Sequence, residues 1–531
     1  MKPPCDEAEI LSASPDSPCM RQAAPWILAA TILGSSMAFI DSTVINVALP
    51  ALQSSFHASI IDVQWVVESY ALLLGALILV GGSVGDLYGR RRIFLAGVAI
   101  FAVGSIWCGL APDIHQLVAA RALQGFGAAF LVPGSLAIIS ASFDETSRGT
   151  AIGTWSGFTA ITTVIGPVLG GWLIEHASWR WAFFLNVPLA IAVILIGLWR
   201  VPESRSHEAQ KLDVAGALLV TLGLGGLVYG LTESARLGWS SARVLATIAA
   251  GVVGLIAFVV VERRTRSPIL PLALFRSRVF SGANLLTFLL YAALAIFFFL
   301  FPLDLIQVQH YSATATGAAV VPMILILFVL SRWSGGLVAR CGPRLPLIIG
   351  PSIVALGFLL CAIPSMGGSY WRSFFVPFVI LGLGMAVSVA PLTTVVMNSV
   401  GRERAGAASG INNAVSRVAG LLAVAVLGIV VVQAFGGRLD SELKRLGVPA
   451  ATRAQIHAHR TDLAAVVIPP NTEARLVPTI QQSIGSSFIF AFRVAMCLCA
   501  GLALLSALQT VVWIRAEAGV SESVAKLSSV R

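Results

Sequence analysis

The chain has 531 residues, of which 57% are hydrophobic and only 11% charged, and its mean hydropathy is +0.87. A soluble protein carries about 25% charged residues, so this composition excludes a soluble enzyme, a secreted disulfide scaffold and a disordered chain. The net charge of +10 would suit a nucleic-acid partner, but positive loops on the cytoplasmic face of a membrane explain it as well.

The chain opens with a polar segment rich in Pro and Ser. It lacks the basic start and short apolar core of a signal peptide, so we predict a disordered cytoplasmic tail over residues 1–25 and a second tail over 514–531. The seven cysteines show no paired spacing, and therefore we predict neither a disulfide framework nor a metal site.

Between these tails, 14 apolar runs reach the roughly 20 residues that a membrane-crossing helix needs. They are expected near residues 26–48, 63–84, 93–111, 116–139, 149–172, 179–200, 213–233, 243–262, 280–302, 313–338, 345–363, 373–397, 405–433 and 485–513. The predicted fold class is an all-α integral membrane protein with two six-helix bundles, over 26–200 and 280–513, and two additional linker helices over 213–262. An outer loop is expected at about 434–484.

The positive charges decide the predicted orientation. With both termini inside, the cytoplasmic segments hold 21 of the 35 Lys and Arg residues, and the short outer loops hold only four. The long outer loop holds six and the spans hold four. The positive-inside rule therefore predicts a multi-pass protein of the cell (inner) membrane with both termini cytoplasmic. The same rule also explains the positive net charge, so no nucleic-acid partner is expected.

An internal repeat divides the chain. The segment 82–91 after the second span returns 253 residues later as 335–344, after the tenth span. Two related halves are typical of transporters. The copies are chemically unequal, because Ala339 stands at the position of Asp86 and Phe378 at the offset that matches Arg121. We therefore expect ion coupling in the first half, while the second half shapes the cavity.

Four motifs follow one another on the expected spans. They are Asp41–Pro50 on the first span, Gly82–Arg91 after the second, Arg121–Gly127 on the fourth, and Gly153 with Gly166, Pro167, Gly170 and Gly171 on the fifth. Over residues 26–513 the chain resembles the 14-helix drug:proton antiporters of the major facilitator superfamily (EmrB/QacA type). The resemblance implies the major facilitator fold and export rather than uptake. No Gly is followed by Lys, so a phosphate-binding loop is absent, and no enzymatic activity or cofactor is expected.

Three ionisable residues are candidates for proton coupling. A carboxylate at the depth of Asp41 is costly unless it is paired, hydrated or protonated, so Asp41 is expected to load and release a proton; a helix-packing hydrogen bond is the alternative. Glu68 could share a proton with Asp41, meet a cationic drug, or reach water at the interface. Arg121 would hold a carboxylate ionised until a proton arrives, a role that the resemblance also implies. A structural ion pair, or a reach to the outer interface, is the alternative.

The loop after the second span is the candidate gate. Asp86, opposed to Arg90 and Arg91 within the glycine frame that includes Gly89, could lock the inner gate in one state; for the arginines alone, topology is the alternative. Gly and Pro in the fifth-span motif permit close helix approach and a bend, although ordinary membrane-helix packing would use them too.

Substrate contacts are expected from Asp41, Glu68 and Asp304, and from the aromatic residues Trp65 and Tyr70, because cation–π contact suits lipophilic cations. Core or lipid-facing packing is the alternative for the aromatic residues, and an interfacial position for Asp304. The roles of Arg417, Glu233 and the outer loop stay open.

The predicted function is a secondary active exporter that exchanges protons for lipophilic or cationic drugs across the plasma membrane by alternating access. One alternative is an exporter of a specific metabolite, antibiotic or lipid; another is a non-transporting membrane sensor. The expected partners are a small lipophilic substrate, protons and the lipid bilayer. The protein is expected to act as a monomer, and a periplasmic adaptor is left open.

Overall fold

The computed structural model describes residues 18–143, 145–205, 212–265, 268–400 and 405–514. The helices of the first half and the linker are α2 (Pro18–Phe56), α3 (Ile60–Tyr88), α4 (Arg90–Leu110), α5 (Ile114–Ser142), α6 (Glu145–His176), α7 (Trp179–Phe184), α8 (Asn186–Arg200), α9 (Val214–Leu237) and α10 (Ala242–Arg264). The remaining helices are η1 (Leu272–Arg276), α11 (Arg278–Leu303), η2 (Asp304–Val308), α12 (Ala313–Ala319), α13 (Val321–Gly335), α14 (Leu337–Cys341), α15 (Arg344–Cys361), α16 (Tyr370–Ser373), α17 (Phe375–Asn398), α18 (Ala405–Arg445), α19 (Ala450–Ala458), η4 (Arg460–Ala465) and α20 (Val477–Trp513).

Within the described residues, 14 helices are long and apolar enough to cross a membrane, one for each span expected from the sequence. Lipid offers no hydrogen-bond partner to the backbone, so apolar segments of this length satisfy their own amides as helices. Polar residues set several helix starts. Ser59 and Asp62 form a reciprocal capping box at the start of α3, and the Asp113 side chain caps α5.

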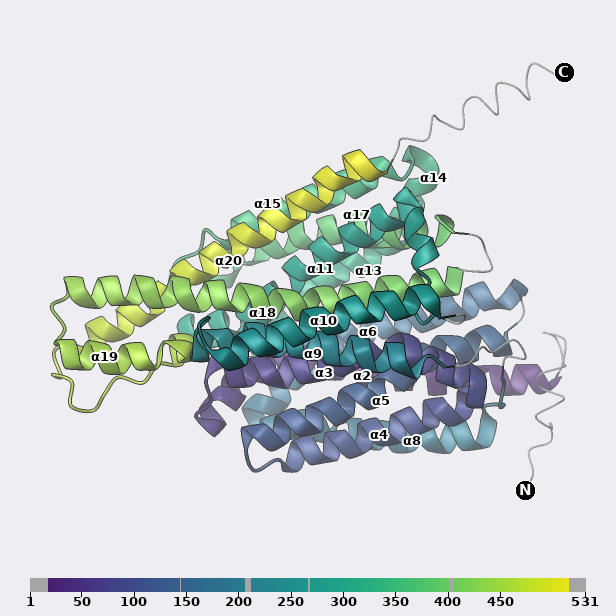
Figure 1. The fold of residues 1–531 in the computed structure, drawn as a ribbon, viewed down its shortest axis with the longest axis horizontal. Coiled ribbons are helices and arrows are strands. Elements are labelled where there is room, and N and C mark those ends of the chain that lie inside the picture. The colour runs from purple at the N-terminus through teal and green to yellow at the C-terminus, as the bar shows by residue number, and fades with distance from the viewer. Residues whose placement is uncertain (1–17, 144, 206–211, 266–267, 401–404, 515–531) are drawn as a thin grey trace, which may run out of the picture.

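The helices form two halves, the N-terminal half (α2–α8) and the C-terminal half (α11–α20). In Figure 1 the purple and blue helices lie below and the green and yellow helices above, with α9 and α10 in front between them. The α9–α10 pair packs against α3 of one half and α18 of the other. α2 begins and α20 ends on the right of Figure 1, and α19 lies on the left. We call these the termini end and the loop end.

Three boundaries differ from the sequence expectation. α2 begins at Pro18, so residues 18–25 of the predicted disordered tail are helical; residues 1–17 and 515–531 of the predicted tails lie outside the described part of the chain. α18 continues to Arg445, and the predicted outer loop contains α19 and η4. The sixth span is divided at Leu185 into α7 and α8.

The two halves are tied together at the loop end. Gln53 of α2 donates from Nε2 to the Asp462 carbonyl of η4 (3.0 Å) and accepts at Oε1 from Gln307 Nε2 of η2 (2.9 Å). The Thr314 hydroxyl of α12 donates to Glu175 of α6. Among the described residues, the hydrogen bonds between the halves lie toward this end, with none seen at the termini end.

Candidate functional site

A buried ion pair lies inside the N-terminal half. Asp41 of α2 is 2% exposed and Arg121 of α5 is 0% exposed, and Arg121 Nη1 donates to Asp41 Oδ2 at 2.5 Å. Both residues stand in apolar helices that cross the membrane. The structure therefore brings together two candidates that lie 80 residues apart in the sequence, in a place where charges are costly unless they are paired.

Uncharged polar side chains complete the shell around this pair. Gln124 donates from Nε2 to Asp41 Oδ1 (2.9 Å) and to Ser105 Oγ (2.6 Å), and it accepts at Oε1 from Arg121 (2.7 Å). Asn186 of α8 donates to Ser105 Oγ (3.2 Å) and more weakly to Asp41 Oδ1 (3.4 Å). Sequence reasoning missed all three residues. Their signal was an amide or hydroxyl within an apolar span, and Gln124 stands inside the motif that contains Arg121.

The Arg121 guanidinium is held on its other sides as well. Its Nε donates to the Val66 carbonyl (3.1 Å), and its Cζ lies 4.3 Å from the centroid of the Tyr70 ring. A Cβ on Gly125 would overlap the Tyr70 backbone, so glycine is what allows α3 and α5 to approach this closely. Arg121 is thus enclosed by protein and does not reach the outer interface.

Glu68 occupies a separate site on α3. It is 1% exposed, accepts from Gln64 Nε2 (2.7 Å) and accepts from the Thr232 hydroxyl of α9 (3.0 Å). The Gln64 amide also reaches the Val424 carbonyl of α18 (3.2 Å). Glu68 therefore lies where the N-terminal half, the linker pair and the C-terminal half meet. Its hydrogen bonds do not lead to Asp41, and it does not reach water at the interface.

The two aromatic candidates on α3 point to different neighbours. Trp65 donates from Nε1 to Glu233 of α9 (3.1 Å) and packs on the Tyr229 ring, with centroids 5.8 Å apart. Glu233 in turn pairs with Arg236 (2.7 Å). Tyr70 instead lies under Arg121, and its buried hydroxyl has no hydrogen-bond partner among the described residues. The two rings therefore do not form one pocket.

Asp304 lies at the start of η2, a short π-helical turn that continues α11. It is 2% exposed, so the interfacial alternative does not hold, while the substrate contact stays a prediction; its Oδ1 has no hydrogen-bond partner in the described chain. Such π-turns often occur at functional sites in membrane and soluble helices.

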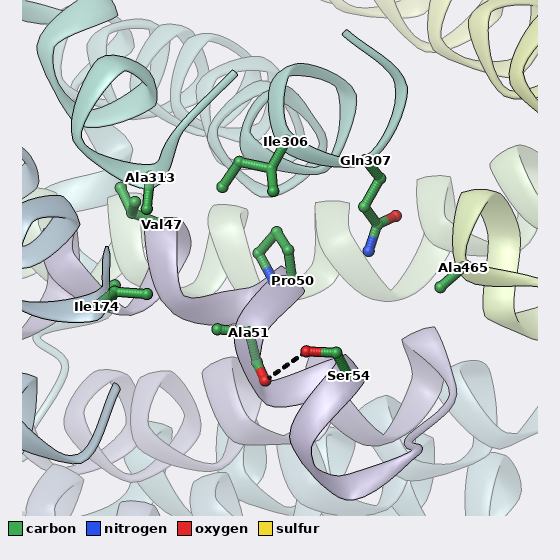
Figure 2. A pocket seen from close by; sticks show the side chains of 9 residues that line it. All are labelled: Val47, Pro50, Ala51, Ser54, Ile174, Ile306, Gln307, Ala313 and Ala465. Atoms are coloured by element: carbon green, nitrogen blue, oxygen red, sulfur yellow. Dashed lines mark hydrogen bonds between the residues drawn. The ribbon is translucent and has the colours of Figure 1, made fainter. Parts of the chain in front are cut away.

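A hollow of about 320 Å³ lies between the halves at the loop end, close to η2. Figure 2 shows Pro50 and Ile306 facing each other across it, with Gln307 at one side. The lining is mostly apolar and comes from Val47, Pro50, Ala51, Ser54, Ile174, Ile306, Gln307, Ala313 and Ala465. Asp41 stands six residues before Val47, about 9 Å along the helix axis, so the ion pair is not part of this lining.

The predicted gate lies at the termini end. Arg90 Nε pairs with Asp86 Oδ1 (2.8 Å), one helical turn away. Gly89 has a φ of 113°, and a Cβ there would overlap the Glu203 carboxyl. Glu203, which sequence reasoning missed, accepts from the backbone amides of Arg91 (3.1 Å) and Arg92 (3.2 Å) at the start of α4. A carboxylate at a helix N-terminus stabilises that helix, so Glu203 ties the α8–α9 connection to the gate loop.

The fifth-span motif serves two contacts of α6. Gly166 and Gly170 lie against Thr43 and Val44 of α2, where a Cβ would overlap those side chains. Gly171 lies against the Ala313 carbonyl of α12, in the other half, and the Pro167 carbonyl lies against Gly317. The motif therefore joins the halves closely at the loop end. Gly153 differs, because no atom lies within 4 Å of where its Cβ would be.

Comparisons with known proteins agree with this architecture. Residues 31–424 match the model of the Major Facilitator Superfamily. The chain is 38% identical, over 422 residues, to the multidrug resistance protein Stp of Mycobacterium tuberculosis (strain CDC 1551 / Oshkosh), covering 79% of this chain and 78% of that protein. It is 33% identical, over 494 residues, to the tetracenomycin C resistance and export protein of Streptomyces glaucescens, covering 91% and 90%.

Solved structures support the same fold. A bacterial homologue of the human lysosomal transporter Spinster, in an inward-facing and unoccupied conformation, superposes with a TM-score of 0.61. The alignment covers 94% of this chain and 99% of that one at 17% sequence identity.

Proposed function

The chain belongs to the major facilitator superfamily, and from this premise we propose that it is a secondary active exporter that exchanges protons for lipophilic compounds by alternating access. It is a multi-pass membrane transporter and not an enzyme. The proton coupling, the direction and the class of cargo are the proposed parts.

The observation that carries the proposal is the buried pair of Asp41 and Arg121. A proton that reaches Asp41 cancels its charge, and the guanidinium, which stays charged, then loses its counter-charge. The neutral shell of Gln124, Ser105 and Asn186 accommodates either state, because amides and hydroxyls can donate or accept. Protonation therefore changes how strongly α2 and α5 attract each other, and thus which arrangement of the two helices is more stable. This change couples the binding of a proton to the rocking of the halves.

Loop-end contacts and the gate loop give the rocking its two limits. The close packing of α6 on α12 through Gly171 and Gly317, with the bridge through Gln53, closes the loop end in this structure. In the opposite state these contacts separate, and the Asp86, Gly89, Arg90 and Arg91 gate at the termini end closes. Closely packed glycine faces suit this role, because they separate without leaving large side chains unpacked.

Glu68 is proposed as a second group that exchanges protons. It is buried at the junction with α9 without a cation among the residues described, and a lone acid in that setting is stable only when it is neutral. Because Glu68 contacts α9 and lies next to α18, a change in its protonation would affect how α3 moves against α18 and against the linker pair.

The proposed location is the cell (inner) membrane, with the termini end facing the cytoplasm as the positive-inside rule predicts. Export then carries cargo from the termini end to the loop end, opposite to the direction of the incoming proton. A monomer is sufficient, because both halves and the coupling pair belong to one chain.

A second candidate function is export of one particular natural compound. The relative in Streptomyces glaucescens carries the name of a single antibiotic, and the match covers 91% of this chain. In that case a dye panel would give weak transport, and one compound would be strongly preferred.

The test is efflux of a panel of fluorescent dyes from cells that express the chain, with and without a protonophore. We expect efflux that stops when the gradient collapses and in the Asp41→Asn variant. Glu473→Gln is the matched control, because it removes an exposed loop-end carboxylate that pairs only at the surface with Arg475. Gradient-independent efflux, or normal efflux by Asp41→Asn at equal protein level, would contradict the proposal.

A further inference from the structure

Arg417 stands between the two halves, deep in a membrane-spanning helix. It is 12 residues after the start of α18 at Ala405, which is about 18 Å along the axis, in a hydrocarbon layer of roughly 30 Å. Its side chain starts on the face toward α3, where a Cβ on Gly75 would lie 3.2 Å from the Arg417 Cβ. The glycine therefore lets α18 approach α3 at the level of the charge.

The positive charge of Arg417 is not balanced by the chain. Among the residues that the structure describes, no carboxylate pairs with it and no hydrogen bond holds its guanidinium. Arg121, by contrast, is neutralised by Asp41. The residue is only partly buried, so a ligand can reach it. Because a guanidinium stays protonated and an unpaired charge inside a membrane costs several kcal/mol, a counter-charge from outside the chain would be stabilised at this position.

Neutral donors stand on the two helices that pack against α18 near this charge. Ala414 of α18 packs against the apolar cluster that contains Tyr70 of α3, and Tyr291 of α11 packs against the cluster that contains Ala419 of α18. The Tyr70 hydroxyl is buried and has no hydrogen-bond partner in the described chain. Asn413 precedes Arg417 by one helical turn, so both side chains lie on the same face of α18, and its amide makes no hydrogen bond with a described residue. Donors from both halves therefore stand on helices that meet next to Arg417.

We propose that the Arg417 guanidinium binds an acidic oxygen group, a carboxylate or a phenolate, on an otherwise apolar cargo. The Tyr70, Tyr291 and Asn413 side chains supply the neutral donors around it. This inference rests on the proposed export function and names its substrate class. Arg417 suits the role because its planar fork of donors matches a carboxylate in two parallel hydrogen bonds.

The charge also sorts cargo by sign. An unpaired cation in a low-dielectric interface repels a cationic compound and attracts an acidic one. The acids that could have met a cationic drug lie elsewhere. Asp41 is already paired, Glu68 is enclosed by Gln64 and Thr232, and Asp304 is buried at the start of η2. Acidic apolar compounds are therefore the preferred class, in place of the lipophilic cations expected from the sequence.

The test measures binding to the purified full chain in lipid nanodiscs, with empty nanodiscs as the background. The probes share one ring system: 1-pyrenebutyric acid, its methyl ester and 1-pyrenemethylamine. We expect the acid to bind at least tenfold more tightly than the amine. Arg417→Gln should weaken binding of the acid at least tenfold and change binding of the ester by less than twofold. Arg417→Lys should retain part of the preference for the acid over the ester. Arg243→Gln, which removes an exposed arginine in the first turn of α10, is the matched control.

The contradicting results are specific. Equal binding of the acid by the parent chain and by Arg417→Gln, or no binding of the acid at all, would overturn the inference. Competition by chloride without a preference for acid over ester would also overturn it, because the resident ligand would then be a small inorganic anion. Protonophore-sensitive efflux is measured on the same variants. If the efflux is absent but the acid preference is present, the export proposal fails and the anion site stands. If the acid preference is absent but the efflux is present, the anion site fails and the export proposal stands.

Discussion

Removing the charge of Asp41 should expose how strongly the chain depends on its buried pair. Asp41→Asn leaves a side chain of almost the same shape, but it leaves Arg121 as an unpaired cation that is fully buried. Breaking a buried pair from one side typically costs about 3–5 kcal/mol. The Gln124 amide can still hydrogen-bond to the carbonyl oxygen of the substituted asparagine, so we expect the lower end, about 3 kcal/mol.

The second half of this experiment removes the stranded cation. In the double variant Asp41→Asn with Arg121→Gln, no charge remains in the cluster, and the hydrogen bond to the Val66 carbonyl and the cation–π contact with Tyr70 are lost on the far side. Losing one such bond costs about 1–2 kcal/mol. The double variant should therefore be more stable than Asp41→Asn alone, which is the non-additivity that a coupled pair produces.

The assay is thermal unfolding of the purified variants in one detergent, followed in parallel with transport. Asp41→Asn should lower the midpoint temperature of unfolding, and we expect the double variant to recover at least half of that decrease. Neither variant should show proton-coupled efflux. Arg121→Gln alone completes the cycle. A double variant no more stable than Asp41→Asn would refute the view that the stranded charge is the cause.

Three further predictions address packing and the two ends of the bundle. Gly125→Ala should lower the unfolding midpoint strongly, since overpacking costs about 1–3 kcal/mol and its Cβ would overlap the Tyr70 backbone, whereas Gly153→Ala meets open space and should be tolerated. Glu203→Gln should speed amide hydrogen exchange at Arg91 and Arg92, because two charge-assisted hydrogen bonds weaken; unchanged exchange would separate Glu203 from the gate. Gln53→Ala removes both bonds that bridge η4 and η2, so distances between spin labels across the loop end should lengthen, and unaltered distances would contradict its role as a bridge.

The sequence predicted the spans well for a physical reason. Backbone satisfaction in lipid requires helices of a known length, and apolar runs of that length are visible without any tertiary information. The paired state of Asp41 and Arg121 was not visible in this way. The two residues lie on different helices, and whether they meet depends on the relative rotation and depth of α2 and α5, which glycines such as Gly125 set through close contact.

Depth counted from span ends suggested a solvent-exposed alternative for two acids. Glu68 and Asp304 stand near the ends of their apolar runs, so reaching water or the interface was the alternative to their roles in proton coupling and substrate contact, yet both are buried. Glu68 is covered by α9, a helix of the linker pair, and Asp304 stands at the start of a π-turn that continues α11. Glu203 was overlooked because it lies outside the spans and acts on backbone amides, which carry no signature in the sequence.

The most direct measurement of the central claim is proton movement during transport. The full chain is reconstituted in proteoliposomes with a pH gradient imposed across the membrane, and accumulation of a transported compound is followed together with internal pH. We expect the parent chain to accumulate the compound against its own gradient while protons move the opposite way. Asp41→Asn should show neither accumulation nor coupled proton flux. If Asp41→Asn accumulates the compound with the same proton flux, Asp41 is not the coupling group.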